Sequence, residues 1–88
     1  MVRETIVKAD IIGHTDHTGS AAVNTRISRN RARSVRNALV RLGIARSRFM
    51  AIIGKSYTEC PPTPTINPSC RKADIFMFVF EAASERSP

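Results

Sequence analysis

Hydrophobic and polar positions along the chain predict three β-strands. Residues 5–12, 49–53 and 73–80 are rich in β-branched, aromatic and other apolar residues, and the first two runs end at Gly13 and Gly54. Short apolar runs that stop at a glycine are typical of strands leading into turns. We therefore expect one strand near each end of the chain and one in its middle.

A long helix is predicted between the first two strands. Over residues 21–42 apolar residues recur at helical spacing, and Gly43 follows as a C-cap. A helix between two strands favours a right-handed crossover that makes those strands parallel. With the last strand added to the same sheet, the sequence predicts an α+β domain with a β-α-β-β core, in which one main helix packs on a small mixed sheet.

One arginine interrupts the apolar side of this helix. A charge on a half-buried face is costly unless it is paired and hydrogen-bonded, so we expect Arg31 to have a carboxylate partner. Asp16 lies in the turn before the helix and is the obvious candidate. The side itself is defined by steps of four residues: Val23, Ile27, Arg31, Val35 and Leu39.

Two interpretations of Asp16 and Arg31 are open. The two side chains could form a purely structural ion pair. Alternatively, Arg31 offers its guanidinium to a ligand carboxylate while Asp16 receives the ammonium group of the same ligand. His14 and His17 flank Asp16, but no nucleophile and base accompany them, so neither catalysis nor a metal cluster is expected here.

The positive charge of the chain is concentrated in one segment. The net charge is +7, and no acidic residue occurs between Asp16 and Glu59. Such a field favours anionic partners. Nucleic acid is the less favoured partner, because the basic residues are not interleaved with the aromatic ones that single-stranded nucleic acids stack on. The arginines of this segment are Arg26, Arg29, Arg31, Arg33, Arg36, Arg41, Arg46 and Arg48.

Two cysteines, Cys60 and Cys70, flank a proline-rich loop. They could be free thiols or half of a metal site, but the two histidines lie far away in the sequence, so a disulfide is the favoured interpretation. A chain of 88 residues has at most one domain with a marginal core. A disulfide across this loop would stabilise that core by about 2 to 3 kcal/mol and would indicate an oxidising compartment.

A set of positions spread over the chain resembles the OmpA-like peptidoglycan-associated domain. The resemblance covers about residues 5–81, within a single domain over residues 1–88 whose tail, residues 82–88, is expected to be flexible. Arg71 to Ile75 is similar to the closing segment of that family. The other matching positions are Gly13, His14, Thr15, Asp16, Gly19, Ser20, Asn24, Ile27, Ser28, Arg31, Ala32, Val35, Leu39, Gly43, Ile44, Arg48 and Gly54.

The resemblance implies noncatalytic binding of peptidoglycan, without a cofactor or metal, that anchors an envelope protein to the cell wall. Asp16 and Arg31 are then the pair that holds diaminopimelate of the stem peptide, with Asn24, Thr15 and Arg71 as further members of the pocket. Some members of the family carry a disulfide before the last strand, where this chain has its two cysteines. A periplasmic or cell-envelope location follows from the same resemblance.

The sequence also departs from the family pattern. The first strand and helix of the family have no counterpart here, and Cys70 and Lys72 replace residues that the family uses at the edge of its pocket. The last strand carries Phe76, Phe78 and Phe80 where polar residues are usual. An exposed apolar face of this kind predicts contact with another chain, a second copy or a segment absent here, the alternative being burial under the chain's own tail. The alternative function is therefore a structural subunit that assembles through this strand and has lost ligand binding.

Overall fold

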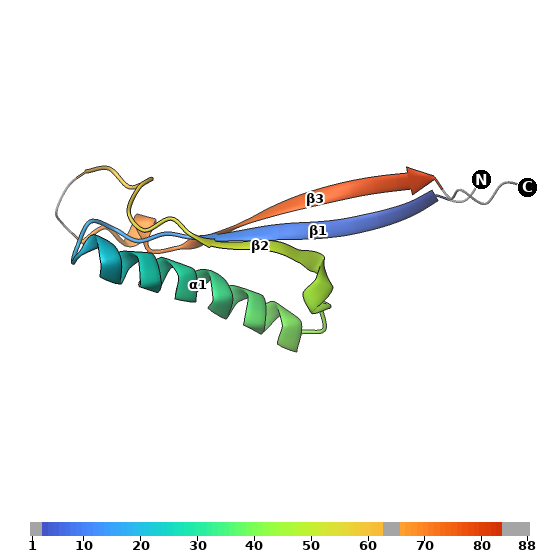
Figure 1. Cartoon of the computed structure of the whole chain (residues 1–88), viewed down its shortest axis with the longest axis horizontal. Helices are drawn as coiled ribbons and strands as arrows, with labels where there is room; N and C mark the ends of the chain where they lie inside the picture. The colour runs from blue at the N-terminus through green and yellow to red at the C-terminus, as the bar shows by residue number, and fades with distance from the viewer. Residues whose placement is uncertain (1–2, 63–65, 84–88) are drawn as a thin grey trace, which may run out of the picture.

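The computed structural model of the chain describes residues 3–62 and 66–83 and has the predicted α+β architecture. One helix packs on one face of a three-stranded sheet (Figure 1). All three predicted strands and the predicted helix are present. The elements are β1 (Arg3–Gly13), α1 (Ala21–Arg41), the short 3₁₀ turn η1 (Arg46–Arg48), β2 (Phe49–Gly54), η2 (Pro68–Cys70) and β3 (Ala73–Ala83).

The sheet has the strand order β2-β1-β3. β1 runs parallel to β2 and antiparallel to β3, as the crossover rule predicts. The register between β1 and β2 shifts by one residue next to Asp10. There the Asp10 carboxylate accepts the backbone N–H of Ala51 at 3.0 Å, which gives this N–H an acceptor where the register shifts.

Local signals in the sequence fix both ends of α1. Ser20 is the N-cap, and its hydroxyl accepts the N–H of Val23. At the other end Gly43 has a φ of 104°, a left-handed conformation that glycine adopts without a steric penalty. The N–H of Ile44 then reaches the carbonyl of Leu39, which is the Schellman arrangement that ends a helix.

The face of α1 that contacts the sheet differs from the predicted one. The buried helix residues are Asn24, Ser28 and Ala32, whereas Val23 and Ile27 are 40% and 37% exposed. The assignment of the Val23–Ile27 side as the packing face is therefore wrong for the first half of the helix. Its small and polar residues face the sheet because the helix backbone lies too close to the strands there for larger side chains.

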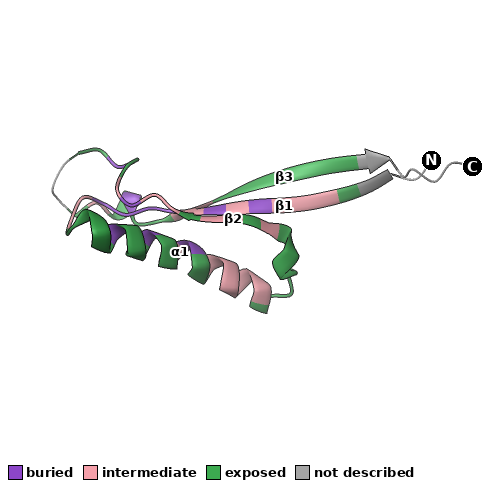
Figure 2. Ribbon diagram, in the orientation of Figure 1, coloured by how far each residue is buried: buried purple, intermediate pink, exposed green. Residues whose placement is uncertain are grey.

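The molecule is elongated, because β1 and β3 continue beyond the rest of the domain. Residues 3–8 of β1 pair with β3 alone, and in Figure 1 this two-stranded ribbon extends past the end of α1. The radius of gyration is 17.1 Å, against about 12 Å for a compact domain of this length. Figure 2 shows the buried residues gathered where the helix, β1 and β2 meet, while β3 is mostly exposed.

β3 is also longer than the sequence predicted. Ala82 and Ala83 pair with Glu4 and Arg3, so they belong to the strand and not to the flexible tail. The rest of that tail, residues 84–88, lies outside the described residues. Within the described residues, no helix combines the length and the apolar character needed to cross a membrane.

Candidate ligand-binding site

The turn between β1 and α1 holds a buried carboxylate that four groups stabilise. Asp16 is 2% exposed. Its Oδ1 accepts the backbone N–H and the hydroxyl of Thr18. Its Oδ2 accepts the N–H of Asn67 at 2.9 Å and Nε of Arg71 at 2.8 Å. These four donors occupy the acceptor positions that a carboxylate has.

Hydrogen bonds to the ionised form keep Asp16 charged. The hydroxyl of Thr18 contributes most, followed by the N–H of Asn67, and together with Arg71 they hold the pKa of Asp16 far below its usual range. Burial acts in the opposite direction but is outweighed. The site therefore contains a fixed negative charge at every pH at which the protein would ordinarily be studied.

Arg31 has a different partner from the predicted one. Its Nη1 donates to the carbonyl oxygen of His14 at 2.6 Å, while the ion pair of Asp16 is with Arg71. The expected direct pair between Asp16 and Arg31 is therefore wrong. The remaining N–H groups of Arg31 have no protein acceptor among the described residues, and this leaves the guanidinium available to a ligand.

Asp16 and Arg31 nevertheless lie around one pocket. Its volume is about 400 Å³, which suits a small polar group or an amino-acid side chain. Thr15 lines it, is 3% exposed, and has a hydroxyl without a hydrogen-bond partner among the described residues. The pocket is lined by Thr15, Asp16, Thr18, Gly19, Val23, Asn24, Ile27, Arg31 and Arg71.

All five residues that the sequence predicted for the site line this pocket, but they differ in what they contact. The Nδ2 of Asn24 donates to the carbonyl of Thr18 at 2.7 Å, so Asn24 fixes the turn. Sequence reasoning missed Thr18 and Asn67. A threonine two residues after an aspartate is the signal of a side-chain-capped turn and could have indicated Thr18. Asn67 is 51 residues from Asp16 in the sequence, and no local pattern indicates that contact.

The two histidines of the turn have structural partners. His14 is buried, and its Nε2 lies 3.0 Å from a carboxylate oxygen of Asp74. The ring of His17 stacks on Tyr57 with centroids 4.4 Å apart. Across the described part of the chain, no group of three or more His, Cys, Asp or Glu side chains is arranged to hold a metal ion.

Cys60 and Cys70 form the predicted disulfide. Their Cα atoms are 5.7 Å apart, and both residues are buried. The bond closes the loop before β3, and Arg71 follows it directly. One end of the carboxylate site is thus attached to a covalently closed loop.

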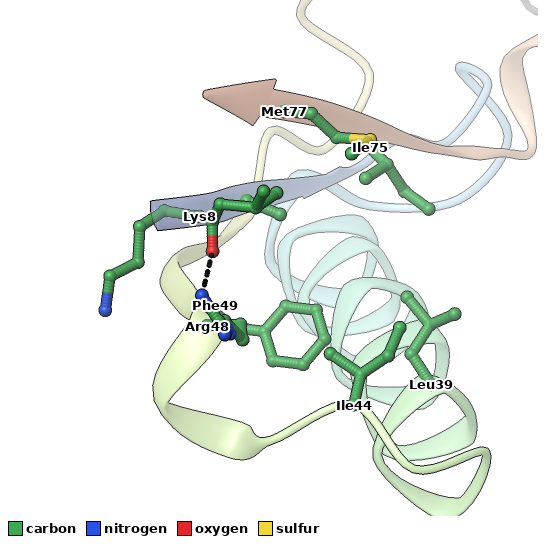
Figure 3. Close-up of a pocket in the computed structure, with 9 residues that line it drawn as sticks. Lys8, Leu39, Ile44, Arg48, Phe49, Ile75 and Met77 are labelled. Carbon is green, nitrogen blue, oxygen red and sulfur yellow. Dashed lines mark hydrogen bonds between the residues drawn. The ribbon is translucent and has the colours of Figure 1, made fainter. Parts of the chain in front are cut away.

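A second hollow, which we call the apolar groove, lies at the far end of α1. Its volume is about 360 Å³, and Figure 3 shows Leu39, Ile44 and Phe49 facing Ile75 and Met77 of β3 across it. Its surface is almost entirely apolar, and the ammonium group of Lys8 points away from it in Figure 3. The groove and the pocket at Asp16 are formed by separate sets of residues.

Comparison with known protein families identifies the class of protein that this fold and pocket define. The sequence profile of the OmpA family matches residues 3–67, which include every element of the domain except η2 and β3. The chain therefore belongs to the OmpA family. Among curated proteins, none matches the sequence. Because the match ends at residue 67, the similarity predicted for Arg71 to Ile75 stays a prediction.

Some properties are common to OmpA-like domains as a class. OmpA-like domains commonly bind peptidoglycan, are generally noncatalytic binding domains, and occur in proteins associated with the cell envelope.

Proposed function

We propose that this chain binds peptidoglycan without catalysis, through the diaminopimelate of the stem peptide, and so anchors a periplasmic or outer-membrane protein to the cell wall. The observation that carries the proposal is the pocket that the ionised Asp16 and Arg31 line together. Both signs of charge within one small pocket match a ligand that has an amine and an acid on the same carbon.

Arg31 is the residue that binds the ligand carboxylate in this proposal. Its free N–H groups can donate to two oxygens of one carboxylate, and Arg71 adds a second guanidinium at the pocket wall. The ligand ammonium group takes the place of the Thr18 hydroxyl on Asp16, because a hydroxyl can rotate away whereas backbone N–H groups cannot. Each charge-assisted contact contributes about 1.5 to 3 kcal/mol, so single sites are weak and the polymer supplies avidity.

Sedimentation with purified sacculi tests the proposal. Arg31→Ala should lose most of the binding of the wild-type chain, and Asp16→Ala should do the same. Arg33→Ala is the matched control, because it removes the same charge from an exposed position of α1 outside the pocket. Circular dichroism of each variant separates loss of binding from loss of folding.

A second comparison tests the chemistry of the ligand. Sacculi whose stem peptides contain lysine present the same amine without the neighbouring carboxylate, so the wild-type chain should bind them less than diaminopimelate-type sacculi. Free diaminopimelate should compete with the sacculi for the pocket. Raising the salt concentration should weaken contacts made by exposed arginines such as Arg33 more than contacts made inside the pocket. Full retention of binding by both Arg31→Ala and Asp16→Ala would refute the assignment.

A second candidate function, assembly with a partner protein, is favoured by the exposure of β3. Phe76, Phe78 and Phe80 are 47%, 39% and 48% exposed and lie on the sheet face opposite the apolar groove, since successive strand residues alternate in direction. Met77, on the groove side, is 68% exposed. Both faces of the strand therefore present apolar side chains that an isolated domain rarely leaves uncovered.

The occupant we propose for the apolar groove is an amphipathic helix of an acidic partner. The net charge of +7 on each copy favours an acidic partner and opposes self-association. A synthetic Leu/Glu amphipathic peptide should bind the wild-type chain, and a Leu/Lys peptide of the same pattern should not. Binding should be lost in Met77→Glu. Light scattering of the wild type and Met77→Glu tests the competing occupant, and a wild-type dimer that Met77→Glu dissociates would replace the acidic partner by a second copy.

A further inference from the structure

The loop closed by the Cys60–Cys70 disulfide leads directly to Arg71, which lines the ligand pocket. Asn67 lies within this loop and Arg71 is the residue that follows it. Both donate to the same oxygen of Asp16, the Asn67 N–H at 2.9 Å and the Arg71 Nε at 2.8 Å. One wall of the pocket is thus supplied by a segment that is more than 50 residues away from Asp16 in the sequence.

Hydrogen bonds to the turn before α1 hold this segment at both ends. At its start Nε2 of His17 donates to the carbonyl of Cys60 at 2.9 Å, and just after its end the N–H of His14 donates to the carbonyl of Lys72 at 2.8 Å. The described loop residues between the two cysteines are largely exposed, and Ile66 is 65% exposed. A loop that buries so little apolar surface gains little from packing. The covalent bond is therefore one of the restraints that bring Asn67 and Arg71 to Asp16, and it is the one that a reductant removes.

We infer that the Cys60–Cys70 disulfide positions the Arg71 wall of the pocket, and that ligand binding depends on the oxidation state of this bond. The inference rests on the proposed function of the pocket and extends it to the residues that hold the pocket in shape. Reduction by a protein or small-molecule dithiol would transfer two electrons and two protons to the bond, giving two thiols here and one disulfide in the reductant. The freed loop then gains conformational freedom, and the contacts of Asn67 and Arg71 with Asp16 become transient.

Arg71 makes the inference measurable. In the oxidised chain its side chain is 42% exposed and is bonded to Asp16 through Nε, and its Nη groups have no acceptor among the described residues. Replacing Arg71 should therefore remove a ligand contact only when the loop is closed. In the reduced chain the same replacement should change binding little, because Arg71 is no longer held at the pocket.

The test is a double-mutant cycle on diaminopimelate-type sacculi. The four proteins are the oxidised wild type, the chain reduced with dithiothreitol, oxidised Arg71→Ala and reduced Arg71→Ala. We expect reduction to weaken binding about tenfold, oxidised Arg71→Ala to weaken it by a similar factor, and the two changes together to add little more. The Cys60→Ser/Cys70→Ser chain should reproduce the reduced protein without reductant.

Leu39→Ala controls for stability, because it destabilises the domain from the apolar groove, which is separate from the pocket. It should leave binding unchanged at temperatures where circular dichroism shows a folded chain. If reduction unfolds the chain, the binding of oxidised Arg71→Ala to sacculi is the remaining test. Unchanged binding by that variant would overturn the inference. Equal binding by oxidised and reduced wild type would also overturn it while leaving the proposed function intact. Absence of binding by the oxidised wild type would overturn both.

Discussion

Gly13 and Gly54 are paired at the carboxyl ends of two parallel strands, and the backbone of α1 lies directly against both. A Cβ atom on Gly13 would lie 1.8 Å from the carbonyl oxygen of Ser28. The close approach explains why α1 turns small residues toward the sheet at this level. The turn that carries Asp16 follows Gly13 and leads into the N-terminal end of the helix.

Replacing Gly13 should therefore be costly. We expect Gly13→Ala to lower the free energy of unfolding by about 3 kcal/mol, because α1 has to move away from the sheet. Gly43→Ala is the control, since a Cβ there meets nothing within 4 Å and the cost is limited to the left-handed backbone, about 1 to 2 kcal/mol. Urea unfolding measures both, and a smaller loss for Gly13→Ala than for Gly43→Ala would contradict the packing described.

Asp16 should make stability depend on pH in the acid range. Because its pKa is lowered in the folded chain, its contribution is fully present above the unfolded pKa, about 3.9, and is lost as the pH falls toward the folded pKa. Asp16→Asn should therefore be less stable than the wild type at pH 7, and the difference should shrink below about pH 4. Urea titrations at several pH values measure it. A difference that stays constant down to pH 2 would show that the charge of Asp16 is not responsible.

The hydroxyl of Ser28 should matter as an acceptor. It accepts the N–H of Ser56 at 2.9 Å and donates to the carbonyl of Thr25. Ser28→Ala leaves the buried Ser56 N–H without a partner, and we expect a loss of about 1 to 3 kcal/mol. Ser34→Ala, at an exposed position of α1, should change stability by less than about 0.5 kcal/mol. Thermal unfolding of the two variants checks the contrast.

The disulfide should stabilise the domain independently of any effect on binding. The bond joins residues separated by 10 positions, and closing a loop of this size contributes about 2 to 3 kcal/mol on the chain-entropy model. The Cys60→Ser/Cys70→Ser chain should therefore unfold at a lower urea concentration than the oxidised wild type. Identical midpoints would mean that the loop is already restrained when the bond is absent.

The sequence predicts the elements of this fold well because each has a local cause. Periodicity identifies α1, Gly43 marks its end, and the order of strands and helix determines the parallel pairing of β1 and β2. The packing face of α1 could not be predicted from spacing. Ser28 faces the sheet instead of Ile27 because of how closely the helix approaches Gly13, and that distance is a property of the assembled structure.

The sequence could indicate residues that line the pocket, but it could not indicate which of them contact one another. Arg31 stands out in the sequence as a charge on the apolar side of the helix, and Asp16 as a carboxylate in the turn before it. Both line the pocket. The pairing of Asp16 with Arg71 spans 55 positions and depends on where the disulfide-closed loop is seated. A pattern of residues near one turn contains no information about that placement.

The position of β3 at the side of the sheet has a practical consequence. Its eleven residues contain no proline, and the strand order leaves the backbone amides and carbonyls on its outer side without a neighbouring strand in the described sheet. Between Asp74 and Glu81 the strand carries no charged side chain that would discourage another extended peptide from hydrogen-bonding to it. Concentrated solutions of the isolated domain are thus exposed to aggregation by strand addition, and a lysine in place of Val79 offers a simple remedy.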